Sequence, residues 1–138
     1  MSDRAVRVLT MIGSPRKGNT YEIVRRIEDK MMSLGPVEFE YIFLKDAYLG
    51  SCCGCQLCFL HGEGACPLGD DRAVMAQKMQ EVDGLILASP VYALQVPAVM
   101  KNLLDRFAYL FHRPRLFGKK ALAVADELSS VCTCSRAC

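Results

Sequence analysis

The sequence predicts an α/β protein in which a parallel sheet is covered by helices on both faces. Short runs rich in branched apolar residues recur along the chain, which is typical of strands buried on both faces. Segments with apolar residues at helical spacing lie between these runs. Because strands and helices alternate, each connection is expected to be a crossover of the kind that builds a parallel sheet.

The first half of the chain is predicted to contain a strand, a helix and a second strand. Residues 6–12 form an apolar run that ends at a Gly-Ser-Pro turn, which indicates a buried strand. The helix is expected to begin at Thr20, to carry apolar residues at helical spacing as far as Leu34 and to end at Gly35-Pro36. Apolar residues then alternate over residues 37–44, as expected of a strand.

The second half repeats the alternation twice. Asp70-Asp71 favours the start of a helix that carries Val74, Lys78, Met79 and Val82. Residues 84–89 are predicted to form a third buried strand, and Pro97 to open another helix that reaches about Phe111. Residues 120–125 are the predicted fourth strand. Ligands of such sheets bind beyond the carboxyl ends of the strands, so the loops at those ends are expected to carry the functional residues.

Composition and charge indicate one globular domain, which we assign to residues 1–125, followed by a polar tail over residues 126–138. The chain is 51% hydrophobic and 23% charged, a balance that supports a packed core. Its net charge of +2 and its mixed signs exclude an extended nucleic-acid or membrane surface, so small molecules or proteins are the expected partners. The apolar stretch near the N-terminus is too short for a secretory signal. A cytoplasmic location is therefore expected, with the eight cysteines used for metal or redox chemistry.

The loop Gly13-Ser14-Pro15-Arg16-Lys17-Gly18-Asn19-Thr20 has the features of a phosphate site. Its glycines let backbone N–H groups turn inward, and the next helix presents its positive end to an anion. Asn19 stands where the nucleoside-triphosphatase loop needs a Lys, so a monophosphate fits better. The alternative is a polar turn in which Asn19 or Thr20 only caps the helix. The candidate phosphate-binding residues are Ser14, Arg16, Lys17, Gly18, Asn19 and Thr20.

The segment Ser89-Pro90-Val91-Tyr92 ends the third predicted strand and therefore lies at the same edge of the sheet. Pro90 fixes the loop, free N–H groups are available to the polar edge of a flat ring, and Tyr92 is able to pack on the face of that ring. These four residues are candidate cofactor contacts. The alternative is that Tyr92 simply packs after a strand.

Cys52, Cys55, Cys58 and Cys66 have the spacing of a chain that wraps a small inorganic cluster, and a Pro follows the last of them. Four soft thiolates so close together favour a cubane iron–sulfur cluster, with Cys53 left over. The alternatives are a structural zinc site and a set of reduced thiols without a metal.

Other polar residues are expected to have no part in chemistry. His61, inside the Cys run, is favoured as a loop residue over a ligand, because four cysteines already complete a set. Asp105 and Arg106 are predicted to form an exposed or helix-anchoring ion pair, and His112 and Arg113 to be solvated.

Taken together, these motifs resemble the flavodoxin-like NAD(P)H-dependent FMN reductases, and specifically their iron–sulfur flavoprotein branch. The match is spread over residues 6–125, with the motifs in family order. The resemblance implies that Ser14, Arg16, Asn19 and Thr20 hold the phosphate of FMN, that Pro90, Val91 and Tyr92 border the isoalloxazine ring, and that Cys52, Cys55, Cys58 and Cys66 ligate a 4Fe–4S cluster. It also implies NAD(P)H as electron donor and a homo-oligomer, either a dimer or a tetramer.

The chain departs from that family pattern after the fourth predicted strand. The family continues with a Gly-rich loop, a helix, a fifth strand and a last helix, whereas residues 126–138 read as a polar tail whose Cys132, Cys134 and Cys138 match no family position. We therefore expect a shortened sheet with an open edge and easy loss of flavin.

The expected function is FMN-dependent oxidoreduction, with electrons passing between a reduced donor, FMN and the cluster. No residue is predicted to act as a catalytic acid or base, since the chemistry would be that of the flavin. One alternative is an NAD(P)H-dependent FMN or quinone reductase without a cluster. The other is a truncated, non-catalytic binding or interaction module.

Overall fold

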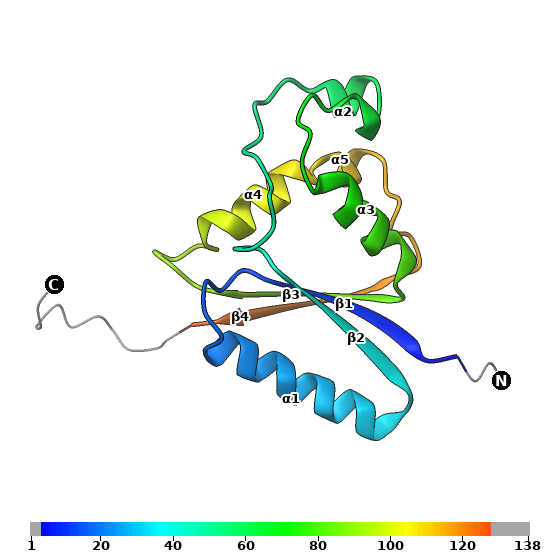
Figure 1. Cartoon of the computed structure of the whole chain (residues 1–138), viewed down its shortest axis with the longest axis vertical. Helices are drawn as coiled ribbons and strands as arrows, with labels where there is room; N and C mark the ends of the chain where they lie inside the picture. Colours follow the sequence, from blue (N-terminus) through cyan, green and yellow to red (C-terminus); the bar gives the residue numbers. More distant parts are fainter. Residues whose placement is uncertain (1–3, 128–138) are drawn as a thin grey trace, which may run out of the picture.

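The computed structural model describes residues 4–127, which fold around one four-stranded sheet in the order β2-β1-β3-β4. The strands are β1 (Val6–Ile12), β2 (Val37–Phe43), β3 (Gly84–Pro90) and β4 (Lys120–Asp126). Each neighbouring pair is parallel, with Val6 opposite Val37 and Gly84 opposite Lys120 (Figure 1). The prediction of an α/β protein with a parallel sheet is confirmed.

Helices cover both faces of the sheet, as the sequence predicts. Helix α1 (Asn19–Leu34) lies on one face, and α3 (Arg72–Glu81) and α4 (Ala98–Arg106) lie on the other (Figure 1). Two short helices, α2 (Leu57–Leu60) and α5 (Tyr109–His112), sit above α3 and α4, and a single 3₁₀ turn, η1 (Glu63–Ala65), follows α2.

The central strand β1 supplies both cores because successive side chains of a strand point to opposite faces. Val8 and Ile12 join the core under α1, whereas Leu9 and Met11 join the core under α3 and α4. Leu9, Met11 and Ile12 are each fully buried, and burial of a side chain of this size stabilises the fold by about 1.5–3 kcal/mol. The well-packed sheet thus holds the ends of the loops at its edge in fixed positions.

The predicted long helix from Pro97 to Phe111 is wrong, because the structure divides it into α4 and α5. Phe107 and Tyr109 are both buried in the same core. Residues two apart on one continuous helix point to opposite sides. The break between α4 and α5 lets both aromatic rings reach the core.

Helix α3 contains Val74, Lys78 and Met79, as predicted, but ends at Glu81, so Val82 lies just beyond it. Met75 and Met79 face the core together with Arg72, whereas Val74 is 56% exposed. Met75 and Met79 are four residues apart and therefore lie on the same side of the helix.

Strand β4 forms one edge of the described sheet, and Ala121, Leu122 and Ala123 are exposed along it. It ends at Asp126, one residue beyond the prediction. The predicted tail lies almost wholly outside the described residues, as do Cys132, Cys134 and Cys138. No helix of the described part is long and apolar enough to cross a membrane.

Candidate functional site

The sheet order places the candidate loops at one edge. All the strands are parallel, so the loops that follow them leave from the same side. The chain moves from β1 outward to β2 and then returns to β3 on the other side of β1, which makes the β1/β3 boundary the topological switch point. Open α/β sheets bind their ligands at such a point. The loops over residues 13–18 and 91–97 flank it.

The loop after β1 turns through hydrogen bonds between close neighbours. Ser14 is buried, and its hydroxyl donates to the carbonyl of Arg16 at 2.7 Å and accepts the N–H of Arg16 at 3.3 Å. The N-cap residue of α1 is Gly18, and no side chain caps this helix. The alternative in which Asn19 or Thr20 only caps the helix is therefore wrong. The first-turn N–H groups have no side-chain partner and are suited to an anion.

Charged and hydroxyl groups of this loop point in different directions. Arg16, Lys17 and Asn19 are exposed, whereas Thr20 is buried. The ammonium of Lys17 lies 5.4 Å from the ring centroids of both Tyr21 and Phe43, a cation–π position at the β2 side of the loop.

Asp126, which the sequence assigns to the tail, ends β4 beside the candidate phosphate loop. The hydroxyl of Thr20 donates to the Oδ2 of Asp126 at 3.4 Å, and the carbonyl of Asp126 accepts the N–H of Val91 at 2.9 Å. The end of β4 is thereby joined to both loops of the switch point. It also sets a carboxylate beside the candidate phosphate loop, where its negative charge would repel a bound anion.

The start of the loop after β1 packs closely against the end of β3 and against α4. A Cβ atom on Gly13 would lie 3.2 Å from the side chain of Met100 in α4 and 3.3 Å from the Oγ of Ser89 in β3, so a larger residue there would crowd both elements. Ser89 is buried and donates to the carbonyl of Pro90 at 2.9 Å. The structure thus brings the Ser89-Pro90-Val91-Tyr92 segment beside the phosphate loop.

The turn that follows Tyr92 is strained. Tyr92 and Gln95 exchange two backbone hydrogen bonds of 2.7 and 2.9 Å, and Ala93 and Leu94 between them have φ of 48° and 63°. Left-handed backbone is rare for residues other than Gly, Asn and Asp, and strained residues of this kind cluster at functional sites. Ala and Leu carry no sequence signal for such a turn, which is why it was missed.

The backbone of this turn corrects one expectation. The N–H of Val91 is bonded to Asp126 and that of Tyr92 to Gln95, so neither is free for the polar edge of a ring. The Tyr92 side chain is 47% exposed at the switch point, where a flat ligand can reach its face.

The loop after β2 curls through left-handed residues. Gly54, Gln56 and Gly62 have φ of 68°, 59° and 99°, and a Cβ atom on Gly54 would meet nothing within 4 Å. Gly54 therefore serves the turn rather than close packing. Among the described residues, five cysteines are free thiols.

All five of these cysteines line one pocket of about 70 Å³: Cys52, Cys53, Cys55, Cys58 and Cys66. The four predicted ligands line the same pocket, and Cys53 lines it with them and is not set apart. Among residues 4–127, no three His, Cys, Asp or Glu side chains are grouped to hold a metal ion. His61 does not line this pocket and is exposed.

Arg106 holds the Cys loop at several points, and this contradicts its predicted pairing with Asp105. Asp105 pairs instead with Lys101 on the exposed side of α4. The Arg106 guanidinium pairs with Asp70, and both side chains are at most 3% exposed. It also donates to the carbonyl of Gly50 at 2.6 Å and to the sulfur of Cys66 at 3.5 Å. A charged residue on the buried side of α4 was the sequence signal for this role.

The Asp70 carboxylate is the other centre of this network. It accepts the N–H groups of Gly50 at 2.8 Å and Arg72 at 3.2 Å, in addition to the Arg106 guanidinium. Burial alone would raise the pKa of Asp70, but these hydrogen bonds favour the charged form more strongly and hold its pKa below the usual carboxyl value. Asp70 is thus a stable anion.

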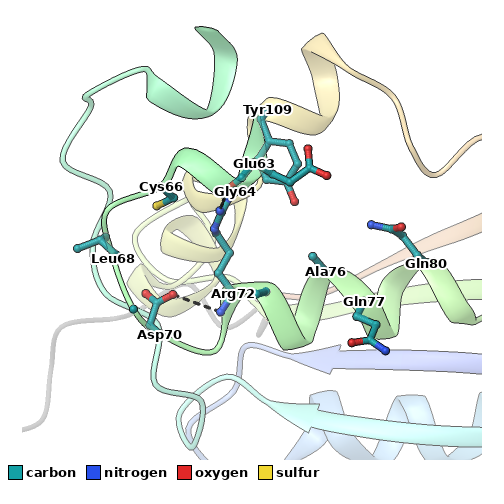
Figure 2. A pocket seen from close by; sticks show the side chains of 12 residues that line it. Glu63, Gly64, Cys66, Leu68, Asp70, Arg72, Ala76, Gln77, Gln80 and Tyr109 are labelled. Atoms are coloured by element: carbon teal, nitrogen blue, oxygen red, sulfur yellow. Dashed lines mark hydrogen bonds between the residues drawn. The ribbon is translucent and has the colours of Figure 1, made fainter. Parts of the chain in front are cut away.

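Arg72 is a second buried cation beside the thiols. Figure 2 shows its side chain rising from the start of α3 toward Glu63, beside Tyr109. Its guanidinium donates to the carbonyl of Glu63 and lies 5.2 Å from the Tyr109 ring centroid. It is 7% exposed, and among the described residues no carboxylate forms an ion pair with it. A buried charge without a counter-charge is costly, so this position favours an anion nearby.

A larger cavity of about 420 Å³ adjoins the thiol pocket (Figure 2). Glu63, Gln77 and Tyr109 line it, and it shares Cys66, Leu68 and Arg72 with the thiol pocket.

Arg113 and His112 are exposed as predicted, but Arg113 also donates to the carbonyl of Phe59 at 3.0 Å and so ties α5 to α2.

Comparison with known proteins places this arrangement in context. A family model described as NADPH-dependent FMN reductase matches residues 6–130. An iron–sulfur flavoprotein of Methanocaldococcus jannaschii is 43% identical over 102 residues, which are 73% of this chain and 51% of that protein. An iron–sulfur flavoprotein of Archaeoglobus fulgidus is 37% identical over 101 residues, 73% of this chain and 48% of that protein. The chain spans about half the length of these curated relatives.

Solved structures of the same fold are more distant in sequence. The NAD(P)H:quinone oxidoreductase from Methanothermobacter marburgensis matches with a TM-score of 0.72 at 18% identity, over 90% of this chain and 65% of that one. An NADH:FMN oxidoreductase in its apo form matches with a TM-score of 0.62 at 20% identity, over 91% of this chain and 60% of that one.

Proposed function

Because the chain belongs to the NADPH-dependent FMN reductase family, in its iron–sulfur flavoprotein branch, we propose that it is an FMN-dependent electron-transfer oxidoreductase that also carries a 4Fe–4S cluster. The observation that supports this proposal is that loops leaving one edge of the sheet build two separate candidate sites. One is the pair of loops at the β1/β3 switch point, and the other is the pocket lined by five thiols.

The loop after β1 fits the phosphate of FMN. The uncapped start of α1 offers N–H groups, and the buried hydroxyls of Ser14 and Thr20 lie on either side of the turn. Arg16 and Lys17 add positive charge from the exposed side, and Gly18 and Asn19 lie at the start of the helix. Charge-assisted hydrogen bonds of this kind contribute about 1.5–3 kcal/mol each.

The loop after β3 is the proposed border of the isoalloxazine ring. Pro90 and Val91 are half-buried and Tyr92 is exposed, so Tyr92 is the residue that can cover the face of a flat ring. Ser89 stays buried and supports the loop from behind. When bound there, FMN supplies the exchange of electrons with donor and acceptor. The chain binds and orients the flavin.

The thiol pocket fits a cluster by the chemistry of its donors and by the charge around it. Cys52, Cys55, Cys58 and Cys66 are the proposed ligands, and soft thiolates are the usual ligands of such clusters. Four thiolates and their cluster are anionic, and two buried guanidinium groups line the same pocket. When bound, the cluster supplies one-electron transfer.

The electron donor and the assembly are further parts of the proposal. A reduced nicotinamide is the proposed donor, by analogy with the family description and with the named activities of the structural neighbours. A small molecule or a redox protein is the proposed acceptor. The cytoplasmic location and the homo-oligomer remain predictions.

A second candidate is an NAD(P)H-dependent flavin or quinone reductase without a cluster. Two observations favour it. Within residues 4–127 no three His, Cys, Asp or Glu side chains are grouped to hold a metal ion, and the fold is similar to that of the NAD(P)H:quinone oxidoreductase. In that case the thiols would be reduced cysteines or a zinc site, and the FMN site would be unchanged.

The test is anaerobic reduction of the chain after it has been loaded with FMN and reconstituted with iron and sulfide. We expect NADH or NADPH to bleach the flavin absorbance and, on the same sample, the cluster absorbance. Bleaching of the flavin in a protein without iron supports the second candidate. An FMN-loaded protein whose flavin is reduced by dithionite but by neither nicotinamide overturns the proposed donor.

A further inference from the structure

Arg106 is the one cation of the described network that reaches a proposed cluster ligand and both ends of the loop that carries it. It contacts Gly50 before the first cysteine, Asp70 after the last and Cys66 itself. The same Nη2 atom lies 3.0 Å from the Oδ1 of Asp70 and 3.5 Å from the sulfur of Cys66. The guanidinium is therefore shared between a carboxylate and a thiol.

This sharing has a direct electrostatic consequence for anything bound by Cys66. A hydrogen bond to a ligand sulfur withdraws negative charge from it, and hydrogen bonds and net charge at the sulfurs are among the factors that set the potential of an iron–sulfur cluster. Reduction adds one negative charge. A nearby N–H donor on a cation therefore favours the reduced form, whereas a nearby carboxylate opposes it.

We propose that Arg106, held in place by Asp70, is a positioning residue that raises the reduction potential of the cluster through its hydrogen bond to Cys66. This inference rests on the proposed function, because it requires the cluster. Asp70 balances the effect: it fixes the guanidinium in reach of the sulfur and at the same time offsets its charge. The two partners are thus expected to shift the potential in opposite directions when each is replaced.

Burial makes the effect large enough to measure. Arg106 and Asp70 are at most 3% exposed, so water screens their charges far less than those of a surface pair. Arg72 lines the same pocket from another side without a carboxylate partner among the described residues, and its charge acts in the same sense as that of Arg106.

Two variants test the proposal by redox titration followed by EPR. In Arg106→Lys the charge remains, but one ammonium cannot replace the planar fork that serves Asp70, Gly50 and Cys66 together. We expect the equilibrium constant for one-electron reduction to fall at least tenfold, which lowers the potential by about 59 mV. In Asp70→Asn the side chain keeps its shape and loses its charge. We expect a shift of similar size in the opposite direction.

The matched control is Arg26→Lys, which makes the same chemical change on the exposed side of α1, across the sheet from the Cys loop. Its potential should equal that of the wild type. Iron is quantified in every sample. Equal potentials in wild type and Asp70→Asn, with iron present in both, overturn this inference alone, even where Arg106→Lys fails to fold. A wild-type chain that holds no iron overturns the proposed cluster and this inference together.

Discussion

The two loops that build the candidate sites leave the same edge of the sheet and are held in opposite ways. The loop after β1 is fixed by bonds between near neighbours, such as the one from Ser14 to Arg16 two residues later. The Cys loop is fixed by Arg106, which lies 36 residues beyond Asp70 and 56 residues beyond Gly50. The tip of the first loop is held by its own neighbours and its ends by the adjoining strands, whereas the Cys loop depends on a helix elsewhere in the chain.

This difference sets what a mutation is expected to do. A change in the short loop removes contacts to a ligand but leaves the loop in place, because the strand and helix on either side hold it. A change in the buried pair leaves an uncompensated charge and releases a long segment at once. The short loop should show losses of affinity, and the Cys loop losses of structure and metal.

The largest expected effect is the loss of the cluster in Cys55→Ser. Removing one of four thiolates leaves an iron without its ligand and open to oxidation. Cys53→Ser is the matched control, because Cys53 lines the same pocket but is not a proposed ligand. Iron and sulfide are measured after anaerobic reconstitution. Equal iron in both variants would show that the ligand set is wrong.

The next effect is the loss of stability in Asp70→Ala. Breaking a buried ion pair by removing one partner costs about 3–5 kcal/mol, because the other charge stays buried. The control is Asp105→Ala, which removes the carboxylate of the exposed ion pair with Lys101 on α4. It should cost far less. Urea unfolding followed by circular dichroism measures both free energies. Similar values would mean that Asp70 does not anchor the loop.

A smaller effect is expected from Asn19→Ala combined with Thr20→Ala. Two polar groups at the start of α1 are removed, and FMN affinity should fall about tenfold or more, since each charge-assisted hydrogen bond contributes about 1.5–3 kcal/mol. Flavin fluorescence titration gives the affinity. Unchanged FMN affinity, with unchanged stability of the protein, would show that this loop does not bind the phosphate.

The smallest effect is expected from Asp126→Asn, and its sign is opposite. The carboxylate beside Thr20 repels a bound phosphate, and two charges about 4 Å apart in water interact by about 1 kcal/mol. Replacing it should strengthen FMN binding about fivefold in the same titration, and less at high salt. Weaker binding would show that Asp126 supports the flavin rather than opposing it.

The same contrast explains which features were predictable. The four strands, α1 and the turn after β1 follow from apolar runs, turn residues and glycine spacing, which act over a few residues. Arg106 was assigned to Asp105, its neighbour in sequence, because nothing local shows that Asp70 lies across from it. Likewise, the strained turn at Ala93 and Leu94 is closed by backbone bonds between Tyr92 and Gln95, and no residue type in it predicts a left-handed backbone.

The break between α4 and α5 has a similar origin. The apolar residues from Pro97 to Phe111 fit one helix, and only the shared core decides that Phe107 and Tyr109 must face the same way. The spacing predicts that Cys52, Cys55, Cys58 and Cys66 act together, but it does not predict that Cys53 shares their pocket or that two buried arginines line it.

The most direct test of the central claim, that this chain carries both a flavin and a cluster, is the stoichiometry of the anaerobically reconstituted protein. FMN, iron and sulfide are quantified on one sample after gel filtration. We expect about one FMN and about four iron atoms per chain. Protein that retains FMN without iron would contradict the cluster, and protein that retains neither after reconstitution would contradict the account as a whole.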